Sequence, residues 1–320
     1  MPSLLQTQII ATLAYSHLFQ FPLTSAEISQ RLIGAELIKQ KFPQFASVRN
    51  PTQSEDIVLA LNKLVLAGKV KRLNNHYFLA EGEAAWIKAR QQKKLIFEQK
   101  LAQANQLVSF AQRLPWIKAV GLSGSVAVAN ADQNADIDFF IVTNRSGLWL
   151  SRLAVLLFSS MKGKRSIIGL GGQEDWCFNL WLGQGSALEL NQVRRSLYTA
   201  YEACQVLWIY DPKGVRLQFA QANSWVAQFI SGSIAASGAD QDSIARSSTA
   251  KLVKSGQPIQ KSGLLNVLNN LAYQLQKTWL RWKVGIPAQD LAMDKAVLHG
   301  PTYGQQLLAR WHELTTRVLK

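Results

Sequence analysis

Residues 119–143 read AVGLSGSVAVANADQNADIDFFIVT, and this stretch predicts more of the fold than any other part of the chain. The apolar residues 117–122 predict a short strand, residues 123–125 a tight turn, and residues 126–129 the start of a short helix. A polar loop follows, and then residues 136–142 predict a second strand whose first and third positions are acidic. The stretch therefore predicts a strand, a turn, a helix and an acidic strand in that order.

The two acids of the second strand are predicted to act together. Residues two positions apart in a strand point to the same face, so Asp136 and Asp138 should project together while Ile137 and Phe139 turn into the core. Two neighbouring carboxylates repel each other, and a divalent cation between them removes that conflict. Oxygen ligands favour Mg²⁺, which shares its remaining positions with water and phosphate oxygens. The spacing thus predicts a metal site at Asp136 and Asp138.

The turn before the short helix has the features of a phosphate-binding loop. Gly124 has no side chain to keep a phosphate away from the backbone, and Ser125 offers a hydroxyl group. The helix that follows offers free N–H groups at its beginning. Ser123, Gly124 and Ser125 are therefore the predicted nucleotide-binding residues.

Together these motifs resemble the nucleotidyltransferase superfamily related to DNA polymerase beta, over about residues 100–210. The family pattern is Gly-Gly or Gly-Ser, a spacer, and then Asp, an apolar residue and a second acid, and here ten residues separate Gly124-Ser125 from Asp136-Ile137-Asp138. The resemblance implies a mixed β-sheet core and a nucleoside triphosphate substrate. It also implies two Mg²⁺ (or Mn²⁺) ions bound by Asp136 and Asp138, and transfer of a nucleoside monophosphate to a hydroxyl acceptor.

The same resemblance calls for a third carboxylate on a later, adjacent strand. The candidate strand is 174–182, in which strict alternation puts Asp175, Cys177, Asn179 and Trp181 on one face, and Trp176, Phe178, Leu180 and Leu182 on the other. Position 177 or 179 should carry the acid, and neither does. Asp175 is the predicted third catalytic residue, Glu189 is a more distant alternative, and otherwise water or the substrate takes the proton. Tyr198 and Tyr201, on a helix after this strand, are further candidates for contacting the substrate.

Residues 1–82 predict a small helical module that ends in a hairpin and resembles a winged helix-turn-helix. Thr24 and Glu27 form a predicted capping box at the start of its second helix, and Asn74-Asn75 suits a tight hairpin turn. The resemblance implies nucleic-acid contacts, and the candidates are on the wing. These are Lys69, Lys71 and Arg72. The open alternative is a module that binds protein or serves only as structure.

The rest of the chain completes an α+β organisation with three predicted parts. Residues 83–215 form the nucleotidyltransferase domain, which begins with a long basic helix over 83–113 whose lysines and arginines, Lys100 among them, should form a solvated face. Residues 216–320 form a helical C-terminal region, in which 231–263 is rich in Ser and Gly and predicts a flexible segment.

Composition narrows the class of protein. The chain has 320 residues and a net charge of +15, which favours a phosphorylated or nucleic-acid partner. Two cysteines and four scattered histidines argue against a disulfide framework or a zinc site. We expect no membrane span and no signal peptide, and hence a cytoplasmic location. Two functions remain open, a metal-dependent nucleotidyltransferase and a nucleic-acid-binding regulator or adaptor whose nucleotidyltransferase domain is degenerate and only senses nucleotide.

Overall fold

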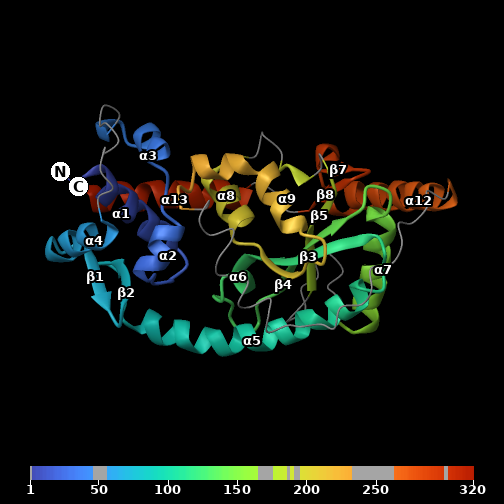
Figure 1. Ribbon diagram of the computed structural model, residues 1–320, viewed down its shortest axis with the longest axis horizontal. Helices are drawn as coiled ribbons and strands as arrows, with labels where there is room; N and C mark the ends of the chain where they lie inside the picture. The colour runs from blue at the N-terminus through green and yellow to red at the C-terminus, as the bar shows by residue number, and fades with distance from the viewer. Residues whose placement is uncertain are drawn as a thin grey trace.

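The computed structural model describes residues 2–45, 56–164, 176–185, 188–190, 195–232, 263–298 and 302–320. The N-terminal module lies toward one end of the molecule, and a six-stranded sheet lies toward the other (Figure 1). A long helix, α5 (Ala85–Ala111), runs along one side of both (Figure 1). Helices and a mixed sheet together confirm the predicted α+β class.

The N-terminal module contains helices and a hairpin, as predicted. The elements are α1 (Leu4–His17), α2 (Ser25–Gln30), α3 (Ala35–Lys41), η1 (Pro43–Phe45), α4 (Ile57–Leu66), β1 (Val70–Leu73) and β2 (His76–Leu79). The capping box is present, because the Thr24 hydroxyl accepts from the Glu27 backbone N–H and the Glu27 carboxylate accepts from the Thr24 N–H. Asn74 and Asn75 both have positive φ, 47° and 61°, as a tight two-residue hairpin requires.

The central sheet is mixed. Its strands lie in the spatial order β6, β3, β4, β5, β8, β7, and only the β4–β5 pair is parallel. The bounds are β3 Ile117–Ser123, β4 Ile137–Thr143, β5 Trp176–Gly183, β6 Leu207–Tyr210, β7 Leu291–Ala292 and β8 Lys295–Val297. Strands β3 and β4 are joined through the short helix α6 (Gly124–Ala127), so the predicted order of strand, turn, helix and acidic strand is confirmed.

Helices cover both faces of the sheet. The other helices are α7 (Leu148–Met161), α8 (Leu197–Cys204), α9 (Val215–Ala222), η4 (Ser224–Gln228), α12 (Gly263–Trp279), η5 (Leu280–Val284), η6 (Ala288–Asp290) and α13 (Thr302–Leu319). One face packs against α5, α7 and α12, and the other faces α8, α9, α13 and the N-terminal module. Among the described residues, no helix has the length and apolar character needed to cross a lipid bilayer.

Strand β5 corrects the predicted alternation. Asp138 pairs with Cys177, but Phe140 pairs with Leu180, so one extra residue of β5 is accommodated between these pairs. After this bulge the faces exchange: Trp181 joins the core beside α7, and Leu180 and Leu182 turn to the face of α8. Strict alternation had predicted the reverse for these three residues.

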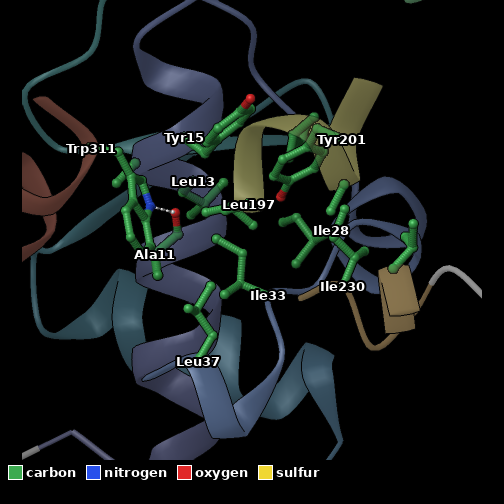
Figure 2. Close-up of a cluster of buried hydrophobic side chains, with 14 of the residues drawn as sticks. Ala11, Leu13, Tyr15, Ile28, Ile33, Leu37, Leu197, Tyr201, Ile230 and Trp311 are labelled. Carbon is green, nitrogen blue, oxygen red and sulfur yellow. Dashed lines mark hydrogen bonds between the residues drawn. The ribbon is translucent and has the colours of Figure 1, made fainter. Parts of the chain in front are cut away.

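The C-terminal helix α13 returns to the N-terminal module. The indole Nε1 of Trp311 donates to the carbonyl of Ala11 at 2.9 Å, and Tyr15 of α1 lies against Tyr201 of α8 (Figure 2). A single apolar cluster therefore links the module to α8 and α13. The predicted boundaries at 82 and 215 stay a prediction, although this cluster crosses both of them. The predicted flexible segment 231–263 lies, apart from its ends, outside the described residues.

Helix α5 spans the predicted range but is less solvated than expected. Arg90 forms an ion pair with Glu27 at 2.5 Å, and both side chains are largely shielded from solvent. Lys100, predicted to lie on a solvated face, is only 2% exposed. The prediction for Lys100 was wrong because this part of α5 packs on the sheet, where its neighbours Ala104 and Leu107 are fully buried.

Candidate functional site

The site begins where β3 ends. Ser123, the last residue of β3, pairs with Asp138 of β4, so the turn after β3 lies directly beside that acid. Gly124 has φ +64°, and a Cβ atom added there would lie 2.4 Å from Oδ2 of Asp138. Only glycine combines this left-handed backbone with such close approach. Gly124 thus brings the backbone turn and the carboxylate together.

The two predicted acids lie at the start of β4 but differ in exposure. Asp136 precedes the strand and is exposed, whereas Asp138 is partly buried on the face that also carries Phe140. Burial and the neighbouring charge of Asp136 raise the pKa of Asp138 to about 6, against the opposing effect of the nearby Cys177 thiol and Asn179 amide. The electrostatic repulsion expected between the two acids is therefore present.

Two residues of β5 hold Asp138 in place. The Asn179 amide Nδ2 donates to Oδ1 of Asp138 at 2.8 Å, and the Cys177 thiol donates to Oδ1 of Asn179 at 3.1 Å. Burial and the two aspartates raise the pKa of Cys177 to about 12, so its sulfur stays a thiol. Positions 177 and 179, where the resemblance implies an acid, do lie beside Asp138. Their side chains are neutral, and they orient Asp138 through hydrogen bonds without adding a negative charge.

The acids predicted to complete the set do not lie in the described site. Asp175 falls outside the described residues. Glu189 accepts a hydrogen bond from Arg195 at 2.6 Å, and its side chain is exposed. Glu189 is not among the residues that line the pocket described below, and its role as the third carboxylate stays a prediction.

A different acid, Glu202, faces the site from helix α8. This helix starts at a capping box between Ser196 and Thr199, and Tyr198 and Glu202 lie one turn apart on the same face. Burial and the charge of Asp138 raise the pKa of Glu202 to about 7. Sequence reasoning missed this residue, although a lone acid among the apolar residues of Leu197–Cys204 was a usable signal.

These residues surround a pocket of about 540 Å³. Its walls come from the turn after β3, from β4 and β5, from α8, and from the ends of α1 and α13. All three predicted nucleotide-binding residues, Ser123, Gly124 and Ser125, line it, as do Asp138 and Glu202. Asp136 is not part of the wall. The volume is in the range of small-ligand and cofactor pockets.

Asp136 and Asp138 can supply only part of the ligands that a metal ion needs. Within the ranges that the structure describes, no three His, Cys, Asp or Glu side chains are grouped closely enough to hold an ion. Two neighbouring carboxylates, one with a raised pKa, do fit Mg²⁺ bound through one or two acids and completed by phosphate oxygens and water. Asp136 and Asp138 therefore fit the predicted ion only together with a phosphorylated ligand.

The residues predicted to contact nucleic acid lie on and beside the β1–β2 hairpin, which the sequence predicts to be a wing, and they make internal contacts. The Lys69 ammonium donates to the Val318 carbonyl near the end of α13, and Lys71 donates to the Gly82 carbonyl at 3.3 Å. The Arg72 guanidinium lies over the Tyr77 ring at 5.6 Å. Lys71 and Arg72 remain exposed, while Lys69 is engaged with α13. The predicted nucleic-acid contacts stay a prediction, with Lys71 and Arg72 as the more accessible pair.

Comparison with known proteins finds no matching family model, no similar curated protein and no similar solved structure.

Proposed function

We propose that this protein transfers a nucleoside monophosphate from a nucleoside triphosphate to a hydroxyl group in a metal-dependent reaction. The observation that carries the proposal is the juxtaposition of Asp138 with the turn at Gly124, at the wall of one pocket. A carboxylate held against an open backbone turn suits joint binding of a cation and a phosphate group.

Each residue then has a defined part. Ser123, Gly124 and Ser125 would hold the triphosphate through backbone N–H and hydroxyl groups. Asp136 and Asp138 would hold Mg²⁺ or Mn²⁺, which when bound neutralises phosphate charge. Asn179 would keep Asp138 oriented through its 2.8 Å hydrogen bond. The resemblance of the motif to nucleotidyltransferases supports the same assignment.

The test is release of pyrophosphate from each of the four ribonucleoside triphosphates with excess Mg²⁺ and a panel of hydroxyl compounds. We expect Asp138→Asn and Asp136→Asn to lower the rate at least about a hundredfold, since each removes a metal ligand. Asp132→Asn, an exposed acid four residues before Asp136, is the matched control and should keep the rate. Equal activity in all four proteins would refute the assignment.

A second candidate function is a regulator that senses nucleotide without turning it over. The position of Asn179, a neutral side chain bonded directly to Asp138, favours this reading. Its signature would be Mg²⁺-dependent nucleotide binding with no pyrophosphate release, together with salt-dependent DNA or RNA binding by the full chain. Loss of nucleic-acid binding in Lys71→Glu/Arg72→Glu would place that partner on the wing.

A further inference from the structure

Several aromatic side chains line the same pocket as the phosphate turn. Tyr15 and Phe19 come from α1 and the turn after it, Tyr198 from α8 and Tyr303 from α13. Leu308 of α13 adds an aliphatic surface. None of these side chains has a part in the binding of phosphate or metal proposed above, so this aromatic side of the pocket is available to a second ligand.

The rings on this side are held by their neighbours. Tyr15 stacks on Tyr201 with centroids 4.1 Å apart and contacts Phe19 at 5.5 Å. Tyr198 meets Tyr303 edge to face at 5.9 Å. Rings fixed in this way form a preorganised apolar surface, which lowers the entropic cost of binding a ligand.

Glu202 is an acidic residue next to these aromatic side chains in the pocket. It lines the pocket one helical turn from Tyr198, and its charge acts on both Tyr15 and Tyr198. Asp138 lines the same pocket, and its charge raises the pKa of Glu202. A carboxylate whose pKa lies near neutrality is suited to accept a proton.

We propose that the aromatic side of the pocket is the acceptor subsite, that it takes a small molecule carrying a hydroxyl group on an aromatic or aliphatic frame, and that Glu202 accepts the hydroxyl proton. This inference rests on the proposed function and adds the class of its second substrate. A pocket of about 540 Å³ fits such a molecule.

The reaction balances with these components. The acceptor oxygen forms a bond to the α-phosphorus of the triphosphate, and the bond from that phosphorus to the bridging oxygen breaks. Pyrophosphate leaves with the electron pair of the broken bond. The hydroxyl proton moves to the carboxylate of Glu202 and is later lost to solvent.

The first experiment measures binding to the full chain by ligand-observed NMR, with Mg²⁺ and α,β-methylene-ATP present. The probes are 2-(4-hydroxyphenyl)ethanol and cyclohexylmethanol, compared with glucose and a short single-stranded RNA. We expect the first two to bind and the last two not to bind. Binding of glucose or RNA in place of the apolar alcohols overturns the inference and leaves the proposed function standing.

Variants locate the subsite. Phe19→Ala should weaken binding of 2-(4-hydroxyphenyl)ethanol about tenfold, because it removes part of the aromatic wall. Phe97→Ala is the matched control: Phe97 is a similarly half-buried phenylalanine on α5 that does not line the pocket. Equal affinities for the two variants, each shown to be folded by circular dichroism, would also overturn the inference.

A third measurement tests the role of Glu202. Glu202→Gln should bind 2-(4-hydroxyphenyl)ethanol within about threefold of wild type yet lose nucleotide transfer to it, seen as loss of the mass-shifted product, and Glu202→Asp should recover part of the rate. Unchanged turnover in Glu202→Gln overturns this role. If wild type binds both ligands but forms no product, the proposed function fails and the role of Glu202 fails with it, while the apolar ligand site remains.

Discussion

The two faces of the central sheet use the same strands for different purposes. On the face toward α5 and α7, Ile137, Phe139 and Ile141 of β4 are fully buried. On the face toward α8, Phe140 and Val142 are buried as well, but Asp138 opens onto the pocket. A strand can carry this difference because successive side chains point to opposite faces.

A polar site is placed at little cost on a face that is not fully packed. We call the face toward α5 and α7 the closed face and the face toward α8 the open face. The closed face is filled by aromatic rings, with Phe139 in contact with Trp176 and Phe178 at centroid distances of 5.6 and 5.4 Å. On the open face, β4 and β5 both begin with polar side chains. In β5 these are Cys177 and Asn179, and after the bulge the side chains on this face are apolar. The face toward α5 and α7 therefore only packs, whereas the face toward α8 both packs and carries the pocket where we propose that the chemistry takes place.

The largest expected effect comes from breaking the closed face. Phe139→Ala should lower the free energy of unfolding by about 3–5 kcal/mol, because it leaves a cavity among packed rings. Phe140→Ala is the matched change on the neighbouring residue and should cost about 1–2 kcal/mol less, since its space joins the existing pocket. Urea denaturation measures both. Equal costs, or a larger cost for Phe140→Ala, would remove the distinction between the faces.

The next predicted change is a gain in the free energy of unfolding, and it comes from Asp138 and Glu202, the acids that line the pocket. The pKa of Asp138 rises on folding from 3.8 to about 6, so the folded state binds more protons than the unfolded state between these values. The contribution of the Asp138 carboxyl group to stability is therefore fully present below pH 3.8 and is lost as the pH rises through about 6. The same reasoning applies to Glu202, from 4.5 to about 7.

We therefore expect Asp138→Asn and Glu202→Gln to stabilise the metal-free protein at pH 8, each by up to about 3 kcal/mol. At pH 4 the gain should disappear. Thermal unfolding at both pH values gives the comparison, and Asp132→Asn is the control for removing a charge in this region. A loss of stability at pH 8 in either variant would show that the fold needs that acid in its charged form.

An effect of similar size is expected at the turn between β3 and α6. In Gly124→Ala the new alanine must adopt a positive φ, and its Cβ also clashes with the Asp138 carboxylate. In Gly163→Ala the φ is similar, +63°, but no described atom beyond the adjacent residues lies within 4 Å of the added Cβ. Gly163→Ala should cost about 1 kcal/mol and Gly124→Ala about 1–3 kcal/mol more. Chemical denaturation of the two variants separates the contact with Asp138 from the backbone conformation. Similar costs would mean that the carboxylate moves aside freely.

The smallest effect is expected far from either face. Lys71→Ala/Arg72→Ala alters exposed wing residues and should change the free energy of unfolding by no more than about 0.5–1 kcal/mol. A larger loss in urea denaturation would mean that the contact of Lys71 with Gly82 and that of Arg72 with Tyr77 contribute substantially to the hairpin.

Local patterns in the sequence predicted local structure well. The Thr24 capping box, the Asn74-Asn75 turn and the strand–turn–helix–strand order around Gly124 all formed, since each depends on residues close together in the chain. The bulge in β5 was missed because period-two alternation has no signal for an extra residue.

Features that depend on distant parts of the chain escaped prediction. Glu202 meets Asp138 only because α8 packs on the sheet, and Trp311 meets Ala11 only because α13 returns to α1. A single sequence carries no record of such long-range packing. The sequence therefore pointed to Ser123–Ser125, Asp138 and the α8 tyrosines Tyr198 and Tyr201, all of which line the pocket, and it missed Glu202.

The most direct test of the central claim is calorimetric titration of α,β-methylene-ATP into the full chain, with Mg²⁺ or with EDTA. We predict binding with Mg²⁺ that weakens at least about tenfold in EDTA, and a similar loss in Asp138→Asn but not in Asp132→Asn. Binding that is absent in wild type, or that is indifferent to both Mg²⁺ and the Asp138 carboxylate, would contradict a shared cation and phosphate at this turn.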